Sequence, residues 1–187
     1  MRVDIISLSF GFESDHRNVE IDKAISSAIS DNIIIFAAAA NDGGNKPRAY
    51  PARRAGVICI HASDGNGNDG GISPSPQARK SNFSTLGISI ESKWKGKKVL
   101  QSGTSFATPV AAALAADLLE FARYKCSLNE YEYRRLHSYD GIEALLHLMV
   151  EERHRYDYIT PGRVWTGSNS NSCEMDLAKK IERIARE

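Results

Sequence analysis

Two near-continuous apolar runs on either side of an amphipathic segment most restrict what this chain can fold into. Residues 3–10 and 33–40 are rich in β-branched and small apolar residues. Strands of this kind are typical of parallel sheets, because helices cover both faces. Between them, residues 18–30 place isoleucines and alanine on one face of a helix. Strand, helix and strand in this order predict a right-handed parallel βαβ unit, with residues 3–10 as a central strand.

A small-residue turn at 101–110 runs directly into an Ala- and Leu-rich helical segment at 111–122. This arrangement places Ser105 at the N-terminus of a helix. There, unpaired first-turn N–H groups and the positive end of the helix dipole favour negative charge on a reacting carbonyl oxygen. Gly103 lets backbone and substrate approach closely. A serine that merely caps the helix is the alternative interpretation.

The heptapeptide at 103–109, G-T-S-F-A-T-P, resembles the G-T-S-x-A-x-P serine motif of the subtilisin-like serine proteases. The resemblance implies a three-layer α/β fold around a mostly parallel sheet. It also implies serine-type endopeptidase chemistry, in which Ser105 forms an acyl-enzyme with a peptide or protein substrate. By the same match, Gly103 and Thr104 belong to the substrate-binding site.

The end of the second apolar run resembles the A-A-G-N segment of that family. The resemblance implies that the side-chain amide of Asn41 and the backbone N–H of Ser105 form the oxyanion hole. It also assigns Ala38 and Ala39 to substrate binding, while Ala40 stands where the family usually has glycine. The alternative is an ordinary turn, since Asn-Asp-Gly-Gly favours turns by itself.

The end of the first apolar run resembles the subtilase strand that ends in S-L-G. That strand pairs with extended substrate, so the resemblance places Ser9, Phe10 and Gly11 along the substrate cleft. A core strand that ends in a turn is the simpler alternative. Residues 80–87 resemble the S-x-F-S-x-x-G segment that passes beneath the active site, although the usual A-P-G does not follow.

The base that a serine nucleophile needs is not identified in this sequence. A serine hydroxyl becomes nucleophilic when an oriented histidine removes its proton. In subtilases the Asp and His come earlier, within D-x-G and H-G-T-H type motifs, and we find neither catalytic motif here. Only His16 and His61 precede Ser105, and neither has the family's glycine neighbours. The resemblance, over about residues 3–120, therefore corresponds to the second half of a subtilase catalytic domain.

Three interpretations follow. The first is part of a larger subtilisin-like protease, whose missing N-terminal half would be its partner. The second is a pseudoprotease that acts as a peptide-binding or regulatory module, and the third is an unrelated α/β domain. Under the first, we predict that this chain alone is inactive and folds poorly, because apolar strand edges lie exposed. We expect a partial, N-terminally truncated peptidase domain at 1–125 and a helical C-terminal extension at 126–187, with a flexible linker near 167–172.

Within that extension, residues 127–130 predict a capping box, and the apolar positions of 140–151 predict a helix. Residues 159–165 predict an extended or turn segment. A terminal helix follows, with its apolar residues on one side.

Composition argues against several other classes of protein. The formal net charge is +1, which does not favour binding to nucleic acid or to membrane surfaces. No apolar run is expected to approach membrane-spanning length, and no signal peptide is recognised before the first strand, so we expect a cytoplasmic location. Three widely spaced cysteines suggest neither a disulfide framework nor a zinc site. Residues 64–71 fail the EF-hand pattern, so we predict a flexible surface loop, no metal site and no cofactor.

Overall fold

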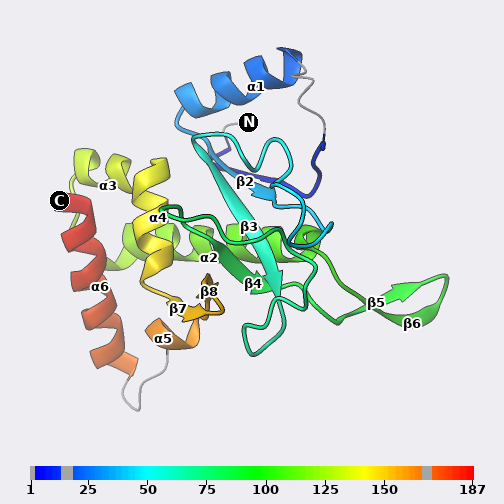
Figure 1. The fold of residues 1–187 in the computed structure, drawn as a ribbon. Helices are drawn as coiled ribbons and strands as arrows, with labels where there is room; N and C mark the ends of the chain where they lie inside the picture. Colours follow the sequence, from blue (N-terminus) through cyan, green and yellow to red (C-terminus); the bar gives the residue numbers. More distant parts are fainter. Residues whose placement is uncertain (1–2, 14–18, 166–169) are drawn as a thin grey trace.

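A six-stranded sheet forms the centre of the computed structural model, which describes residues 3–13, 19–165 and 170–187 (Figure 1). Its strand order is β1-β2-β3-β4-β8-β7. The strands β1, β2, β3, β4 and β8 are parallel to one another, and β7 is antiparallel to β8. The strands are β1 (Ile5–Leu8), β2 (Ile34–Ala38), β3 (Val57–Ser63), β4 (Phe83–Leu86), β7 (Val150–Arg153) and β8 (Tyr156–Ile159).

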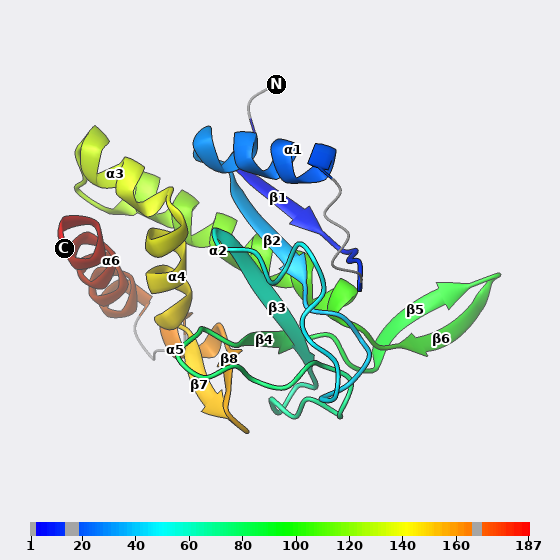
Figure 2. The ribbon, with the colours of Figure 1, turned by 45° about the horizontal axis from the view of Figure 1, so that its top comes forward.

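Helices cover both faces of this sheet, which makes the fold a three-layer α/β arrangement (Figure 2). Because side chains alternate across a strand, Ile35 of β2 packs under α1 and Phe36 packs in the cluster that contains α2. The helices are α1 (Val19–Ser30), α2 (Thr104–Lys125), α3 (Glu130–Leu136), α4 (Tyr139–His147), α5 (Gly162–Trp165) and α6 (Ser170–Arg186). The predicted fold class and the βαβ unit are therefore confirmed.

The position of β1 differs from the prediction of a central strand. Among the described strands β1 pairs only with β2, so it lies at an edge of the sheet. Ser7 is exposed on it, and Val3, Phe10 and Phe12 beside it expose 42%, 47% and 44% of their surface. The prediction rested on the apolar composition of residues 3–10. Apolar composition indicates that a strand is buried, but it does not indicate how many strands pair with it.

Helix α2 is long and apolar enough to cross a membrane, judged by length and composition alone. The prediction that no apolar run approaches that length is therefore wrong. In the structure α2 packs against the sheet, and Ala107, Ala111 and Ala115 are fully buried there. Small side chains let the helix axis lie close to the strands, so this composition is explained by core packing.

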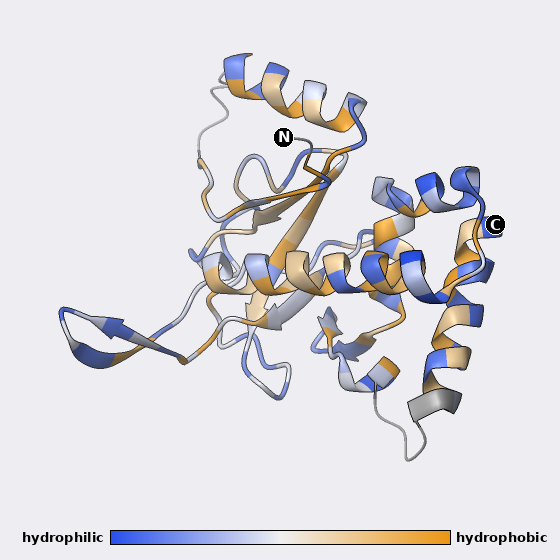
Figure 3. Cartoon of the chain, turned by 180° about the vertical axis from the view of Figure 1, so that it is seen from behind, coloured by the Kyte–Doolittle hydropathy of each residue, from blue (hydrophilic) through white to orange (hydrophobic). Residues whose placement is uncertain are grey.

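A separate two-stranded hairpin, β5 (Ile90–Trp94) and β6 (Lys97–Gln101), extends away from the rest of the protein just before α2. Figure 3 shows that hydrophilic residues cover much of it, whereas β2 and β3 are hydrophobic.

Two predictions in the C-terminal region are corrected by the structure. The helix expected at 140–151 ends at His147, and Val150–Arg153 forms β7 instead. Residues 159–165 include the short helix α5, Gly162–Trp165. The linker predicted near 167–172 falls partly on residues 166–169, outside the described part of the chain, and partly on the start of α6. Leu177, Ile181 and Ala185 of α6 are buried in the same cluster as α2 and the sheet.

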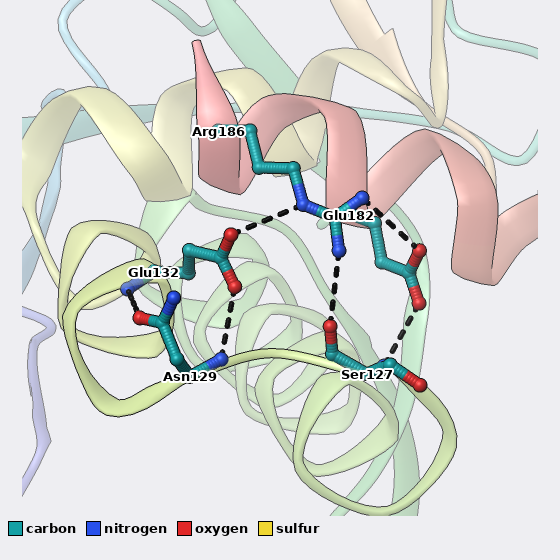
Figure 4. Close-up of polar contacts among 5 residues, drawn as sticks. All are labelled: Ser127, Asn129, Glu132, Glu182 and Arg186. Atoms are coloured by element: carbon teal, nitrogen blue, oxygen red, sulfur yellow. Dashed lines mark hydrogen bonds and ion pairs between the residues drawn. The ribbon is translucent and has the colours of Figure 1, made fainter.

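Polar contacts hold α6 against the segment that leads into α3 (Figure 4). Arg186 donates from Nε to Glu132 at 3.1 Å and from Nη2 to the Ser127 carbonyl at 3.1 Å. The Ser127 N–H donates to Glu182 at 2.8 Å. The capping box is formed by Asn129 and Glu132, each accepting from the backbone N–H of the other. The predicted box at 127–130 was therefore two residues out of register.

Candidate active site

Ser105 is the second residue of α2, and Gly103 occupies the N-cap position without a side-chain cap. Ser105 therefore does not cap this helix, which removes the simplest structural explanation for it. The Gly103 N–H donates to the Gly87 carbonyl at 2.8 Å. A Cβ at Gly87 would lie 2.9 Å from the Cβ atoms of both Ala107 and Ala62, closer than side chains tolerate. The turn before Ser105 is thus packed tightly onto the sheet.

The side chain of Asn41 is fixed by the first residue of α2. Its Oδ1 accepts from the Thr104 N–H at 2.8 Å and from the Thr104 hydroxyl at 3.1 Å. Because a backbone N–H can only donate, the oxygen of the amide must face the helix. Among the described residues the Nδ2 group has no hydrogen-bond partner, and it would lie 3.3 Å from a Cβ at Gly103. An N–H donor is therefore presented beside the turn that carries Ser105.

Thr104 connects the strand end and the helix, and it is fully buried. Its hydroxyl oxygen also lies 3.4 Å from both the N–H and the carbonyl of Ala40. Ala40 has φ of 114°, a conformation that non-glycine residues rarely adopt. This is the position where the family usually has glycine, and Thr104 contacts its backbone on both sides.

Ser9 and Ser105 form a reciprocal pair. The Ser9 hydroxyl donates to the Ser105 carbonyl at 2.9 Å, and the Ser105 hydroxyl donates to the Ser9 carbonyl at 3.2 Å. Pro109 stands four residues after Ser105 and has no N–H to donate, so the Ser105 carbonyl lacks its usual helical partner. Ser9 supplies that partner. Sequence reasoning placed Ser9 in the cleft but missed this pairing, for which the proline was the available signal.

The other predicted cleft residues lie on either side of this pair. Phe10 and Gly11 follow β1 and are exposed. A Cβ at Gly11 would lie 2.6 Å from that of Ala49, so glycine is needed for this close approach. Ala38 and Ala39 are buried, and the Ala39 N–H and carbonyl both bond within the fold. The structure brings together Ser9, Asn41, Gly103, Thr104 and Ser105.

His61 cannot act on Ser105 in this arrangement. It is fully buried in β3, and it contacts Cys59, on the face that packs under α1. Its neighbour Ala62 faces α2 instead. Burial, and secondarily the charge of Arg48, lowers the pKa of His61 to about 3. No histidine among the described residues bonds to the Ser105 hydroxyl, and His16 lies outside them.

The loop at 64–71 is ordered by its own hydrogen bonds. The Asp64 carboxylate accepts from the Asn66 N–H at 2.8 Å and from the Asn68 N–H and side-chain amide at 2.9 Å each. The Asn68 side-chain bond is the main reason that the pKa of Asp64 is lowered. Tyr158 and His154 of the β7–β8 hairpin also bond to this loop. Within the described ranges no cluster of three or more potential metal-ligating side chains occurs.

Comparisons with known proteins identify the family of this chain. The model of the subtilase family matches residues 1–146. Over 116 residues the chain is 34% identical to the minor extracellular protease Epr of Bacillus subtilis (strain 168), covering 62% of this chain and 17% of that protein. Over 132 residues it is 33% identical to the subtilisin-like protease het-Q2 of Podospora anserina, covering 64% of this chain and 35% of that protein.

A solved structure of the prenylagaramide maturation protease PagA superposes with a TM-score of 0.62 at 24% identity, over 95% of this chain and 62% of that one. The protease domain of PatA, as its S218A mutant, gives the same TM-score over 94% of this chain and 60% of that chain. These likenesses concern the fold. This chain spans only part of each relative, and it belongs to the subtilase family of serine endopeptidases.

Proposed function

We propose that this chain is the nucleophile-bearing half of a subtilisin-like serine endopeptidase domain. The Ser105 hydroxyl oxygen attacks the carbonyl carbon of a peptide bond, and the C–N bond breaks as the amine leaves with the proton that a base has taken from the serine. Water then hydrolyses the acyl-enzyme and frees Ser105. The substrate class is a peptide or protein. The single observation that carries this proposal is the pair of hydrogen bonds from Thr104 to Asn41, because they fix an amide donor beside the serine turn.

The proposed oxyanion hole consists of the Asn41 Nδ2 group and the Ser105 backbone N–H. The latter belongs to the first turn of α2, where N–H groups have no helical acceptor. The positive end of the helix dipole adds to the stabilisation of negative charge there. Neither group has to move far when charge develops, because Thr104 already holds the Asn41 side chain. Preorganised donors of this kind are the largest single contribution in many acyl-transfer enzymes.

The proposal requires a histidine and an aspartate from a segment outside the described residues. The Ser105 hydroxyl donates to a backbone carbonyl, which is no base, so it is not activated as it stands. Two features support docking of a further segment at β1. Its outer edge has no partner among the described strands, and Val3, Phe10 and Phe12 expose apolar surface beside it. The chain alone is then expected to be inactive.

The test uses the longest natural reading frame that contains this sequence. Upstream D-x-G and H-G-x-H motifs should be present, and the expressed protein should cleave a fluorogenic peptide. Ser105→Ala should abolish cleavage, while Ser102→Ala, in the same turn, should reduce it little. Cleavage that survives Ser105→Ala would refute the assignment.

A pseudoprotease is the second candidate, and one observation favours it. The Ser105 hydroxyl is bonded to Ser9, and no described histidine reaches it. In that case the cleft would bind extended peptides without cutting them. An upstream reading frame without Asp and His motifs, together with peptide binding that survives Ser105→Ala, would select this function.

A further inference from the structure

A cavity of about 650 Å³ lies at the amino ends of β3, β4 and β8, where Val57, Phe83 and Asp157 contribute to its lining. The proposed active site lies at the opposite ends of the strands, because Asn41 follows the carboxyl end of β2. In the parallel part of a sheet the amino ends and the carboxyl ends are separated by the length of the strands. The cavity is therefore a separate feature that the protease proposal does not use.

Five cationic side chains belong to the lining of this cavity. Those that line it are Arg48, Arg53, Arg54, Arg79 and Lys80. Two carboxylates also line it, and both already accept a hydrogen bond. Glu143 accepts from the Tyr139 hydroxyl at 3.2 Å, and Asp157 accepts from the Asn82 N–H. The positive charge in the lining therefore exceeds the negative charge.

Arg48 is the most informative residue of the lining, because it is only 4% exposed. Its Nη2 donates to Asn82 Oδ1 at 2.6 Å and to the Ser81 carbonyl at 3.3 Å. Its Nε is buried and has no hydrogen-bond partner. A buried N–H without an acceptor costs free energy, so a ligand that supplies an acceptor to this group would stabilise the protein.

Arg54 repeats this pattern on the same cavity. Its Nη2 donates to the Ser26 hydroxyl at 2.6 Å, and its Nε lies 3.9 Å from Asp22. Its Nη1 is buried and unpartnered. Two guanidinium groups that line a single cavity thus each have one buried N–H without a partner. Guanidinium donors match the oxygens of phosphate and carboxylate groups in both charge and geometry.

We propose that this cavity binds the phosphate group of a small molecule, with the guanidinium groups of Arg48 and Arg54 as its main cationic partners. The volume is in the range of about 300–1,000 Å³ that small-molecule sites occupy. A phosphate suits the site better than a single carboxylate, because it carries more charge and more acceptor oxygens to place among these cations. Arg79 and Lys80 are exposed at the rim, where they would attract the anion.

The test is isothermal titration calorimetry on the protein expressed from its whole reading frame. Inorganic phosphate, AMP and adenosine are the probes, and the two phosphate-bearing probes distinguish bare phosphate from a phosphate ester. We expect AMP or phosphate to bind and adenosine not to bind. Arg54→Gln should weaken binding by about tenfold or more, as for the loss of a hydrogen bond to a charged group. Lys98→Gln, which removes one charge from the distant β5–β6 hairpin, is the control and should leave affinity unchanged.

A second variant guards against structural effects of Arg54→Gln, because Arg54 also contacts α1. Arg79→Gln combined with Lys80→Gln alters exposed side chains and should weaken binding while leaving the circular dichroism spectrum unchanged. Three results would overturn the proposal: no binding of phosphate or AMP up to about 10 mM, binding of adenosine as tight as that of AMP, or equal weakening by Lys98→Gln.

Discussion

Asn41 has two roles on two different atoms, and substitutions can separate them. Its Oδ1 accepts from Thr104, which holds the strand end to the start of α2. Its Nδ2 is the proposed donor to the oxyanion. Asn41→Asp keeps an acceptor oxygen and removes the amide donor, whereas Asn41→Ala removes both. Asn45→Ala, at an exposed position of the same loop, is the matched control.

The magnitudes follow from these contacts. Asn41→Ala leaves the N–H of the fully buried Thr104 without its acceptor, although the Thr104 hydroxyl can still reach the Ala40 carbonyl at 3.4 Å. One orphaned buried donor lowers the free energy of unfolding by about 1–3 kcal/mol. For a chain of this length the Tm should fall by roughly 3–10 °C. Asn41→Asp should leave Tm unchanged or slightly raised, because a negative charge near a helix N-terminus contributes about 0.3–1 kcal/mol.

Differential scanning calorimetry measures the first effect, and peptide cleavage by the protein from the whole reading frame measures the second. Both Asn41 variants should lose about 100- to 1000-fold in kcat, as for the loss of one oxyanion donor. Only Asn41→Ala should lose stability. The reasoning is refuted if Asn41→Asp unfolds at as low a temperature as Asn41→Ala, or if it retains normal turnover.

Three further predictions concern the frame around the site. Ser9→Ala removes the hydroxyl that bonds to the Ser105 carbonyl, so we expect a loss of about 1 kcal/mol in the free energy of unfolding; an unchanged urea midpoint would contradict this role. Burial holds the pKa of His61 near 3 in the folded protein, below its ordinary 6.5. As pH drops, the His61 imidazole is therefore protonated in the unfolded chain before it is protonated in the folded one. The free energy of unfolding should then fall between pH 6.5 and pH 3. His61→Leu should flatten that dependence in denaturation curves across this range, and a curve as steep as that of the native protein would count against it. Arg186→Met should expose α6 to limited proteolysis. Arg183→Met should not, because the ion pair of Arg183 with Glu187 at 3.0 Å joins α6 only to the residue that follows it. Equal cleavage of both variants would argue against the contacts in Figure 4.

Local patterns predicted the elements that depend on local spacing. The two apolar runs and the intervening amphipathic segment became β1, α1 and β2, because periodicity decides which face a side chain occupies. The prediction from residues 101–110 that Ser105 lies at the N-terminus of a helix is likewise confirmed, because Ser105 is the second residue of α2. The resemblance to the A-A-G-N segment of the subtilase family, and no local pattern, placed Asn41 beside it; in the structure the Asn41 side chain accepts from the Thr104 N–H.

Features that depend on distant partners could not be predicted in the same way. β1 lies at the sheet edge because no described strand pairs with its other side, which no local pattern records. The helix expected at 140–151 stops at His147 because the following residues pair with β8. The Ser9–Ser105 contact joins residues 96 positions apart. The cationic cavity draws on Arg48 and Arg54 from one loop and on Arg79 from another.

The central claim is that Ser105 is a nucleophile whose base comes from a segment outside this chain. The most direct measurement is covalent labelling with a fluorophosphonate probe, followed by mass spectrometry of the labelled peptide. We predict that Ser105 is labelled in the protein expressed from the whole reading frame and remains unlabelled in the monodisperse isolated chain of 187 residues. Labelling of Ser105 in the isolated chain, or labelling of a different serine in the longer protein, would contradict the account.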